Sequence, residues 1–151
     1  MALNDTLRDA QTEVLGQAVD SLRRAHLPHY EESGPEVAQQ RLRDLFALVI
    51  ECLANRDLTQ MCQYSERVAD DRFTAGFGIA EVQTAFNVLE EAIWQVVVPR
   101  LPSEELAEDT GLVGTVLGAG KDALARKWVS LATSRHISTL DLSALFAGTR
   151  S

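Results

Sequence analysis

The sequence predicts an all-α protein of five to six helices, packed as a compact helical bundle or a globin-like stack. Apolar residues recur at steps of three or four along most of the chain. No run of alternating apolar and polar residues indicates a strand, and short turns containing Pro or Gly separate the periodic stretches. The 151 residues, of which 46% are hydrophobic and 24% charged, suit a single domain over residues 1–151.

The first two helices are expected on either side of a turn at residues 32–35. The first covers residues 4–27, with Asn4 as its N-cap, and Pro28 should end or bend it because proline lacks the backbone N–H. The second begins at Pro35, with Ser33 and Glu36 at the spacing of a capping box, and stops at a break over residues 55–57. Its expected buried stripe is Ala38, Leu42, Leu45, Val49, Cys52 and Leu53.

The third and fourth helices are expected to flank a glycine-containing turn. The third begins after Asp57 as N-cap, with Gln60 three positions on, and ends at Gly76 and Gly78. The fourth covers residues 79–96, where apolar residues repeat at steps of three and four, and Pro99 stops it. One face of the third helix carries Leu58, Met61, Ser65, Val68 and Arg72.

A fifth helix is expected from Ser103 to about Thr133, although four glycines weaken the helical preference of its first half. Within it, Gly114 and Gly118 have the spacing that lets two helix backbones approach closely, either inside the fold or across a dimer. A short helical tail over residues 138–148 would present Leu140, Leu142, Leu145 and Phe146.

Charge and hydropathy argue against several classes of partner. The net charge is −8, and the 14 Lys and Arg residues alternate with acids instead of forming a basic face. We therefore expect no nucleic-acid binding and no adhesion to anionic lipid. The longest uncharged stretch, residues 92–99, is far too short to cross a membrane, and the N-terminus lacks the apolar segment of a secretory signal. These features predict a cytoplasmic protein without membrane contact.

No residue pattern predicts a metal or a cofactor. Cys52 and Cys62 match neither a disulfide framework nor a zinc pattern. His26 and His29 have a spacing that could place both on one helix face, but Pro28 lies between them, and surface histidines are the better interpretation. His136 lies near a helix end, so a haem site is also disfavoured.

No catalytic motif is present either. Neighbouring acidic residues on a helix point in different directions, so their carboxylates do not converge on one cleft and are interpreted as solvent-exposed. We therefore expect no enzymatic activity and no catalytic residues. Arg72 falls at a core-facing position, and a buried charge needs a partner. Glu81 and Glu91 on the fourth helix are candidates, which favours a structural ion pair over an arginine that binds a ligand.

The middle of the chain resembles a known sensor domain. The pattern consists of Arg41-Leu42-Arg43-Asp44-Leu45-Phe46, Asp57-Leu58, residues 64–72 and Gly76-Phe77-Gly78-Ile79-Ala80-Glu81-Val82. It resembles the N-terminal sensor domain of RsbRD-type RsbT co-antagonists. The resemblance implies a globin-like helical domain without haem, dimerisation, and a sensory or regulatory role in bacterial stress-response signalling. It offers no catalytic residues, and it directs attention to Tyr64, Arg72, Phe77 and Glu81 as ligand-binding or structural residues.

These observations predict a non-catalytic signalling domain that works through a homodimer and through a partner of the kinase, STAS or anti-sigma type. The family's chains usually continue into an output domain such as STAS, and no such stretch follows here, so action through a partner is expected. The alternative is a helical cofactor-binding protein that takes haem or an apolar ligand. The candidate dimer or partner interface comprises Gly114, Gly118, Leu142, Leu145 and Phe146.

Overall fold

The fold is an assembly of α-helices in the computed structural model, which describes residues 2–139, with side chains described for residues 3–135. Seven α-helices and two short 3-10 helices account for this part of the chain, and it contains no strand. The all-α prediction is confirmed, while the expected number of five to six helices is too low. The helices are α1 (Ala2–Asp9), α2 (Gln11–Arg24), α3 (Pro28–Ser33), α4 (Pro35–Asn55), α5 (Thr59–Thr74), α6 (Ile79–Val96) and α7 (Leu106–Thr139).

The additional helices lie at the start of the chain, where the region predicted as one helix over residues 4–27 is divided into α1 and α2, and α3 follows it. Ala10 separates α1 from α2, with φ of −92° and ψ of 3°. The two helices remain nearly continuous, because Ala10 N donates to Thr6 O and Val14 N donates to Ala10 O. His26 adopts a left-handed φ of 51° after the end of α2. Pro28 does not merely interrupt the helix but begins α3, because its fixed φ suits a first helical position.

The turns around α4 and α5 confirm the expected breaks but not the expected capping. Gly34, with φ of 90°, precedes Pro35 at the start of α4, and Arg56, with φ of 54°, follows its end. The Ser33 hydroxyl donates to His29 O and forms no cap for α4. Asp57 does accept the N–H of Thr59 at 3.0 Å, although Leu58 is the residue that immediately precedes α5.

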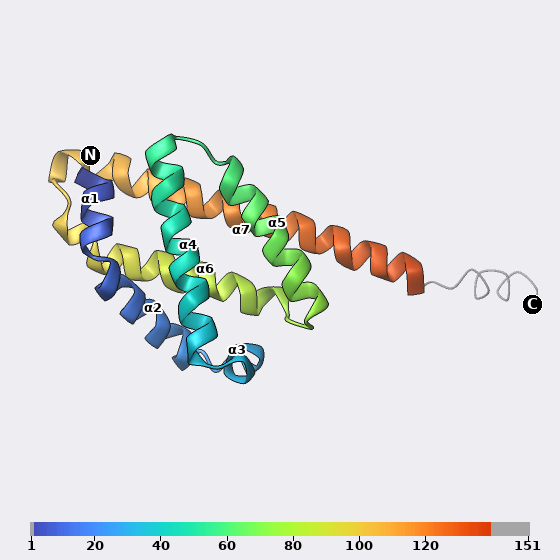
Figure 1. Ribbon diagram of the computed structural model, residues 1–151. Helices are drawn as coiled ribbons and strands as arrows, with labels where there is room; N and C mark the ends of the chain where they lie inside the picture. Colours follow the sequence, from blue (N-terminus) through green and yellow to red (C-terminus); the bar gives the residue numbers. More distant parts are fainter. Residues whose placement is uncertain (1, 140–151) are drawn as a thin grey trace, which may run out of the picture.

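Helix α4 occupies the centre of the fold. It contacts each of the other six α-helices in the described part of the chain and crosses α6 and α7 (Figure 1). Its side chains Phe46 and Val49 are 1% and 0% exposed. Helix α5 packs along α7, and α2 packs against α6, so that the core lies between α4 and these pairs.

Helix α7 is the longest element and extends beyond the other helices at one end (Figure 1). Its 34 residues correspond to about 50 Å at 1.5 Å per residue. It begins at Leu106, after the 3-10 helices Val98–Arg100 and Ser103–Glu105, and continues past the expected end at Thr133. The predicted tail over residues 138–148 overlaps the end of α7, and from residue 140 onward it lies outside the described residues.

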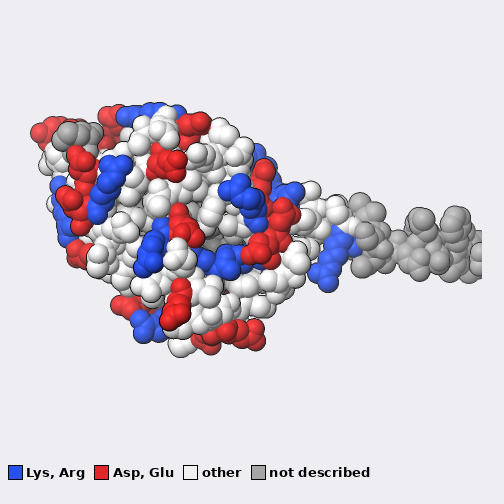
Figure 2. All heavy atoms as spheres, viewed as in Figure 1, with Lys and Arg blue, Asp and Glu red and all other residues white. Residues whose placement is uncertain are grey.

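No helix in residues 2–139 is both long enough and apolar enough to cross a bilayer. On the face that Figure 2 shows, basic and acidic side chains are interspersed, as the alternation in the sequence predicts.

Candidate functional site

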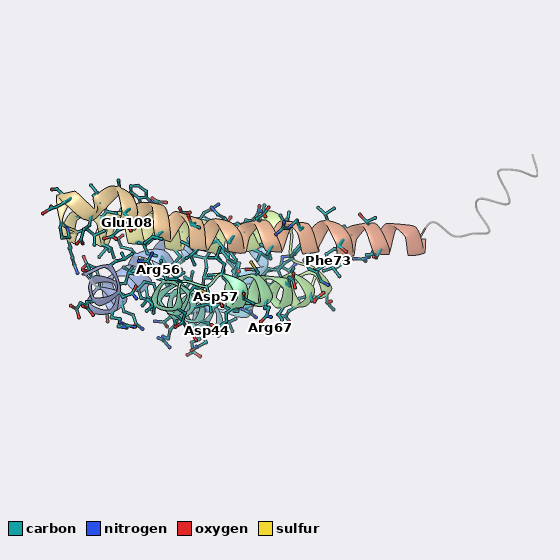
Figure 3. The ribbon with its side chains drawn as sticks, turned by 90° about the horizontal axis from the view of Figure 1, so that it is seen from above. Asp44, Arg56, Asp57, Arg67, Phe73 and Glu108 are labelled. Carbon is teal, nitrogen blue, oxygen red and sulfur yellow. The ribbon has the colours of Figure 1, made fainter. Side chains whose placement is uncertain are left out.

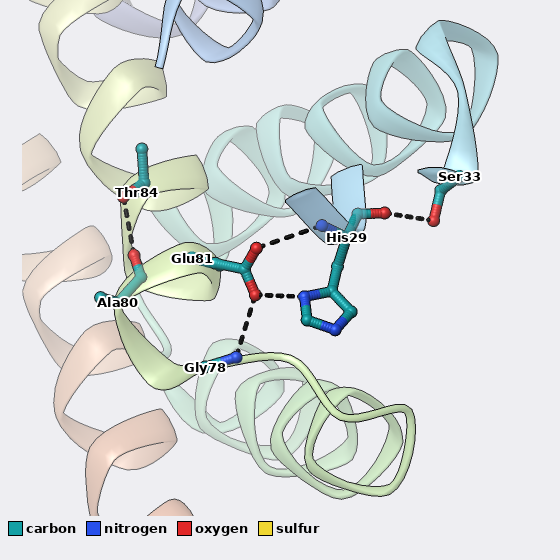
Figure 4. A network of polar contacts seen from close by, with 6 residues as sticks. All are labelled: His29, Ser33, Gly78, Ala80, Glu81 and Thr84. Atoms are coloured by element: carbon teal, nitrogen blue, oxygen red, sulfur yellow. Dashed lines mark hydrogen bonds and ion pairs between the residues drawn. The ribbon is translucent and has the colours of Figure 1, made fainter. Parts of the chain in front are cut away.

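A partly buried hydrogen-bond network joins α3 to the beginning of α6. Pro28 starts α3 and so places His29 in its first turn, opposite Glu81 in the first turn of α6. The Glu81 carboxylate accepts three hydrogen bonds: from His29 N at 3.2 Å, from His29 Nδ1 at 2.7 Å and from Gly78 N at 3.0 Å (Figure 4). Both carboxylate oxygens are therefore engaged in holding α3 against α6.

Two opposing influences set the charge of Glu81, which is 9% exposed. Burial raises the pKa of this carboxyl, but the hydrogen bonds from Gly78 N, His29 N and the His29 ring outweigh burial and lower the pKa below its usual value. Glu81 is thus ionised at neutral pH. Because an ionised carboxylate can only accept, the His29 Nδ1 atom carries the proton of their shared hydrogen bond.

The ring of Phe77, in the turn between α5 and α6, has aromatic and cationic neighbours. His29 stacks on it with ring centroids 4.8 Å apart, and Tyr30 meets it edge-on at 5.3 Å. The Arg72 guanidinium lies over the same ring, 5.7 Å from its centroid. A continuous set of contacts therefore leads from Arg72 through Phe77 to His29 and Glu81.

Arg72 is buried, as the sequence predicts, but it does not pair with either candidate glutamate. Its side chain is 4% exposed, and it forms an ion pair with Asp71, the preceding residue. Glu81 faces the three donors of α3 and the turn instead, and Glu91 is exposed and accepts a hydrogen bond from Gln95 at 3.2 Å. The expected Arg72–Glu81 or Arg72–Glu91 pair is replaced by a local pair within α5.

Arg72 also lines a groove between α4 and α5, which we call the arginine groove. Its volume is about 220 Å³. Two of its buried donors, Arg41 Nε and Arg72 Nε, have no hydrogen-bond partner. Asp44 and Arg67, from α4 and α5, lie on the side of the molecule away from α7 (Figure 3). The lining residues are Arg41, Asp44, Tyr64, Arg67, Val68, Asp71 and Arg72.

Tyr64 connects the arginine groove to a larger neighbouring hollow of about 480 Å³. Asp44 and Arg67 also line both spaces, and Gln60 and Gln63 add amide groups to the larger one. Burial raises the pKa of Tyr64 to about 12, so its hydroxyl keeps its proton and remains a hydrogen-bond donor.

A separate cavity of about 370 Å³ lies between α2, α3 and α4 and is largely apolar. Its wall includes Leu22, Leu27, Tyr30 and Ala38, with His26 and Glu31 also lining it. The His26 side chain is 80% exposed, and its Nδ1 lies 3.1 Å from Glu31 Oε1. This cavity has room for a small apolar molecule.

The predicted interface glycines do not mediate close helix packing within the chain. A Cβ atom at Gly118 would meet no atom within 4 Å, and one at Gly114 would lie 3.9 Å from Glu90 Oε2. The close approach occurs at Gly120, where a Cβ would lie 2.8 Å from Met61 Sδ. The other predicted interface residues, Leu142, Leu145 and Phe146, lie outside the described residues.

Sequence reasoning missed several features of these sites. Arg41 and Arg67 belong to the quoted pattern, but no periodicity distinguishes them from solvated charges. The exposed Trp94 (48%) and Val129 (63%) were also not identified.

Within the described residues, no group of three or more His, Cys, Asp or Glu side chains is placed to hold a metal ion.

Comparison of the chain with protein-family models, with curated proteins and with solved structures finds no match.

Proposed function

We propose that the protein is a non-catalytic regulatory domain that senses or relays a signal, acting as a homodimer on a partner of the kinase, STAS or anti-sigma type. The observation that carries this proposal is the convergence of Arg72, Phe77 and Glu81, three residues of the sensor-domain pattern, at one junction between helices. We further propose that the protein acts in the bacterial cytoplasm, in stress-response signalling of the RsbRD type.

The chemistry of the junction supports a regulatory role over a catalytic one. Glu81 accepts three hydrogen bonds, so it is not available as a free acid or base, and Arg72 pairs with Asp71. These groups instead hold α3, the α5–α6 turn and α6 together. A ligand or partner that favours a different packing of this junction would change the relative positions of three helices.

The same helices offer a route to α7. At the end of α5, Phe73 packs edge-on against Trp128 of α7, with ring centroids 5.5 Å apart. The Arg135 guanidinium lies 5.8 Å from the centre of the Phe73 ring. A shift of α5 is therefore transmitted to the end of α7 that extends from the body, and this end is where we place the contact with a second copy or a partner.

Light scattering at high micromolar concentration tests the homodimer. We expect a dimer for the unmodified chain and a monomer for Val129→Glu, because Val129 is an exposed apolar side chain on α7 that a charge would replace. Ser130→Glu is the matched control, since it adds the same charge at the neighbouring exposed position. A strict monomer for the unmodified chain would contradict the dimer proposal.

The partner is tested by affinity capture from the native host, followed by mass spectrometry. We expect a kinase, STAS or anti-sigma protein with the unmodified chain, and its reduced recovery with Val129→Glu but not with Ser130→Glu. Recovery of no signalling protein of these classes would count against the proposal.

A second candidate function, binding of an apolar ligand, is favoured by the cavity between α2, α3 and α4. Haem is a less suitable occupant, because His26 beside this cavity is 80% exposed and contacts Glu31. Addition of haem followed by an absorbance spectrum tests the cofactor form of this candidate. A Soret band that depends on His26 or His29 would favour it over the regulatory domain.

A further inference from the structure

We infer that the arginine groove binds a small anion carrying a phosphoryl or carboxylate group. This inference deepens the proposed function by naming the chemical class of the signal, and its biological role rests on that proposal. The binding itself depends only on the residues of the groove.

The groove concentrates positive charge in an acidic protein. The chain has a net charge of −8, yet three arginines, Arg41, Arg67 and Arg72, line a space of about 220 Å³ together with two aspartates. Guanidinium groups present several N–H donors in a planar arrangement that matches the oxygens of phosphate and carboxylate. The volume is below that of a drug-sized pocket, which indicates a small ligand or the anionic end of a larger one.

Two of the donors have no acceptor. Arg72 is 4% exposed and uses Nη1 for Asp71, whereas its Nε, like that of Arg41, is buried without a hydrogen-bond partner. Buried donors in folded proteins are nearly always satisfied, so two such atoms from different helices lining one groove indicate an acceptor from outside the chain. An anion in the groove that reaches these guanidinium groups would supply the missing acceptor oxygens.

Two aspartates also line the groove, and the anion competes with one of them for the arginines. Asp44 accepts a hydrogen bond from Gln40 at 2.8 Å. The Asp71 side chain is 66% exposed, and its distance of 3.9 Å from Arg41 Nη1 is too long for a hydrogen bond. The same Asp71 oxygen pairs with Arg72 Nη1, so an anion that takes the inner position between Arg41 and Arg72 displaces this exposed carboxylate toward water. Tyr64, which keeps its proton, adds a neutral donor at the same site.

Occupancy would also reach the junction described above. Arg72 lies over the Phe77 ring, which stacks on His29. An anion that draws the Arg72 guanidinium toward the groove would weaken its contact with Phe77. The anion thus acts on the same residues that hold α3 and α6 together.

Nuclear magnetic resonance of the arginine Nε–Hε groups in the full chain tests the inference directly. We expect saturable shifts of the Arg41 and Arg72 signals on addition of inorganic phosphate or malonate, weakening as salt is raised. Saturation by phosphate alone would assign a phosphoryl ligand, and saturation by malonate alone a carboxylate ligand. No saturable shift with either probe would overturn the inference.

Three variants locate the binding. Arg72→Lys keeps the charge but loses the planar donor arrangement, and we expect an affinity loss of about tenfold or more. Arg67→Ala changes an exposed residue and should weaken binding even if Arg72→Lys fails to fold. Arg43→Lys is the matched control, because Arg43 is an exposed residue of α4 outside the groove. Unchanged affinity in both Arg72→Lys and Arg67→Ala would place the anion elsewhere and refute the inference. Light scattering of the same samples measures the oligomeric state, so a failure of the dimer proposal can be distinguished from a failure of anion binding.

Discussion

The close contact at Gly120 gives a quantitative prediction about the packing of α7. A Cβ atom at Gly120 would lie 2.8 Å from Met61 Sδ and 3.0 Å from Phe86 Cε2. Both neighbours are buried, at 0% and 2% exposure, so neither can move aside without disturbing the core. Gly118, two residues earlier in the same helix, has open space at the corresponding position. The pair Gly120→Ala and Gly118→Ala therefore separates crowding from helix propensity.

The expected magnitudes follow from these contacts. Alanine is more favourable than glycine in a helix interior by about 1 kcal/mol, and this gain applies to both variants. Crowding of a packed core typically costs about 1–3 kcal/mol, and this cost applies to Gly120→Ala alone. Gly118→Ala should therefore be more stable than the unmodified chain, and Gly120→Ala should be less stable than Gly118→Ala by about 1–3 kcal/mol.

Urea denaturation followed by circular dichroism at 222 nm measures the free energy of unfolding of the unmodified chain and of the two variants. Thermal melting gives an independent check, since about 2–4 °C of melting temperature corresponds to 1 kcal/mol in a protein of this size. If Gly120→Ala were as stable as Gly118→Ala, the close packing of α7 against Met61 and Phe86 would be refuted.

Two further predictions concern ionisable groups. The pKa of Glu81 is lowered in the folded state, so its contribution to stability is present above the usual glutamate pKa and is lost as pH falls through the lowered value. Between pH 7 and about pH 3, urea titrations should show that Glu81→Gln loses less free energy of unfolding than the unmodified chain does. Equal losses in the two proteins would contradict the hydrogen-bond network around Glu81. Burial raises the pKa of Tyr30 and of Tyr64 to about 12. Absorbance at 295 nm should show both phenols ionising near that pH in the folded protein and near pH 10 in urea, so stability falls as pH rises above about 10. Ionisation near pH 10 in the folded state would contradict their burial.

The sequence was most informative where strong breakers flank a regular apolar pattern. Pro35 and Pro99 enclose residues whose periodicity predicts α4 and α6, and α6 occupies residues 79–96 as expected. The division at Ala10 could not be predicted, because alanine is the strongest helix former and no residue there disfavours a helix. The left-handed turn at His26 could not be predicted either, since no glycine marks it in the sequence.

The candidate site was predicted only in part. The helical period placed Arg72 on a buried face, and this placement is correct. Its partner was predicted wrongly, because acids were expected on the facing helix, whereas the pair forms with Asp71, the preceding residue of the same helix. The bond between His29 and Glu81 joins residues 52 positions apart and depends on how α3 packs against α6. No local pattern can indicate a contact of that kind.

The central position of α4 has a consequence for synthesis of the chain. Residues 35–55 leave the ribosome early, but α5, α6 and α7, which cover much of α4, follow only later. Until then the buried apolar side chains of α4, Phe46 and Val49 among them, lack the cover that the complete fold gives them. The nascent polypeptide therefore exposes an apolar helix face until these helices are synthesised, and such surfaces promote aggregation and chaperone binding.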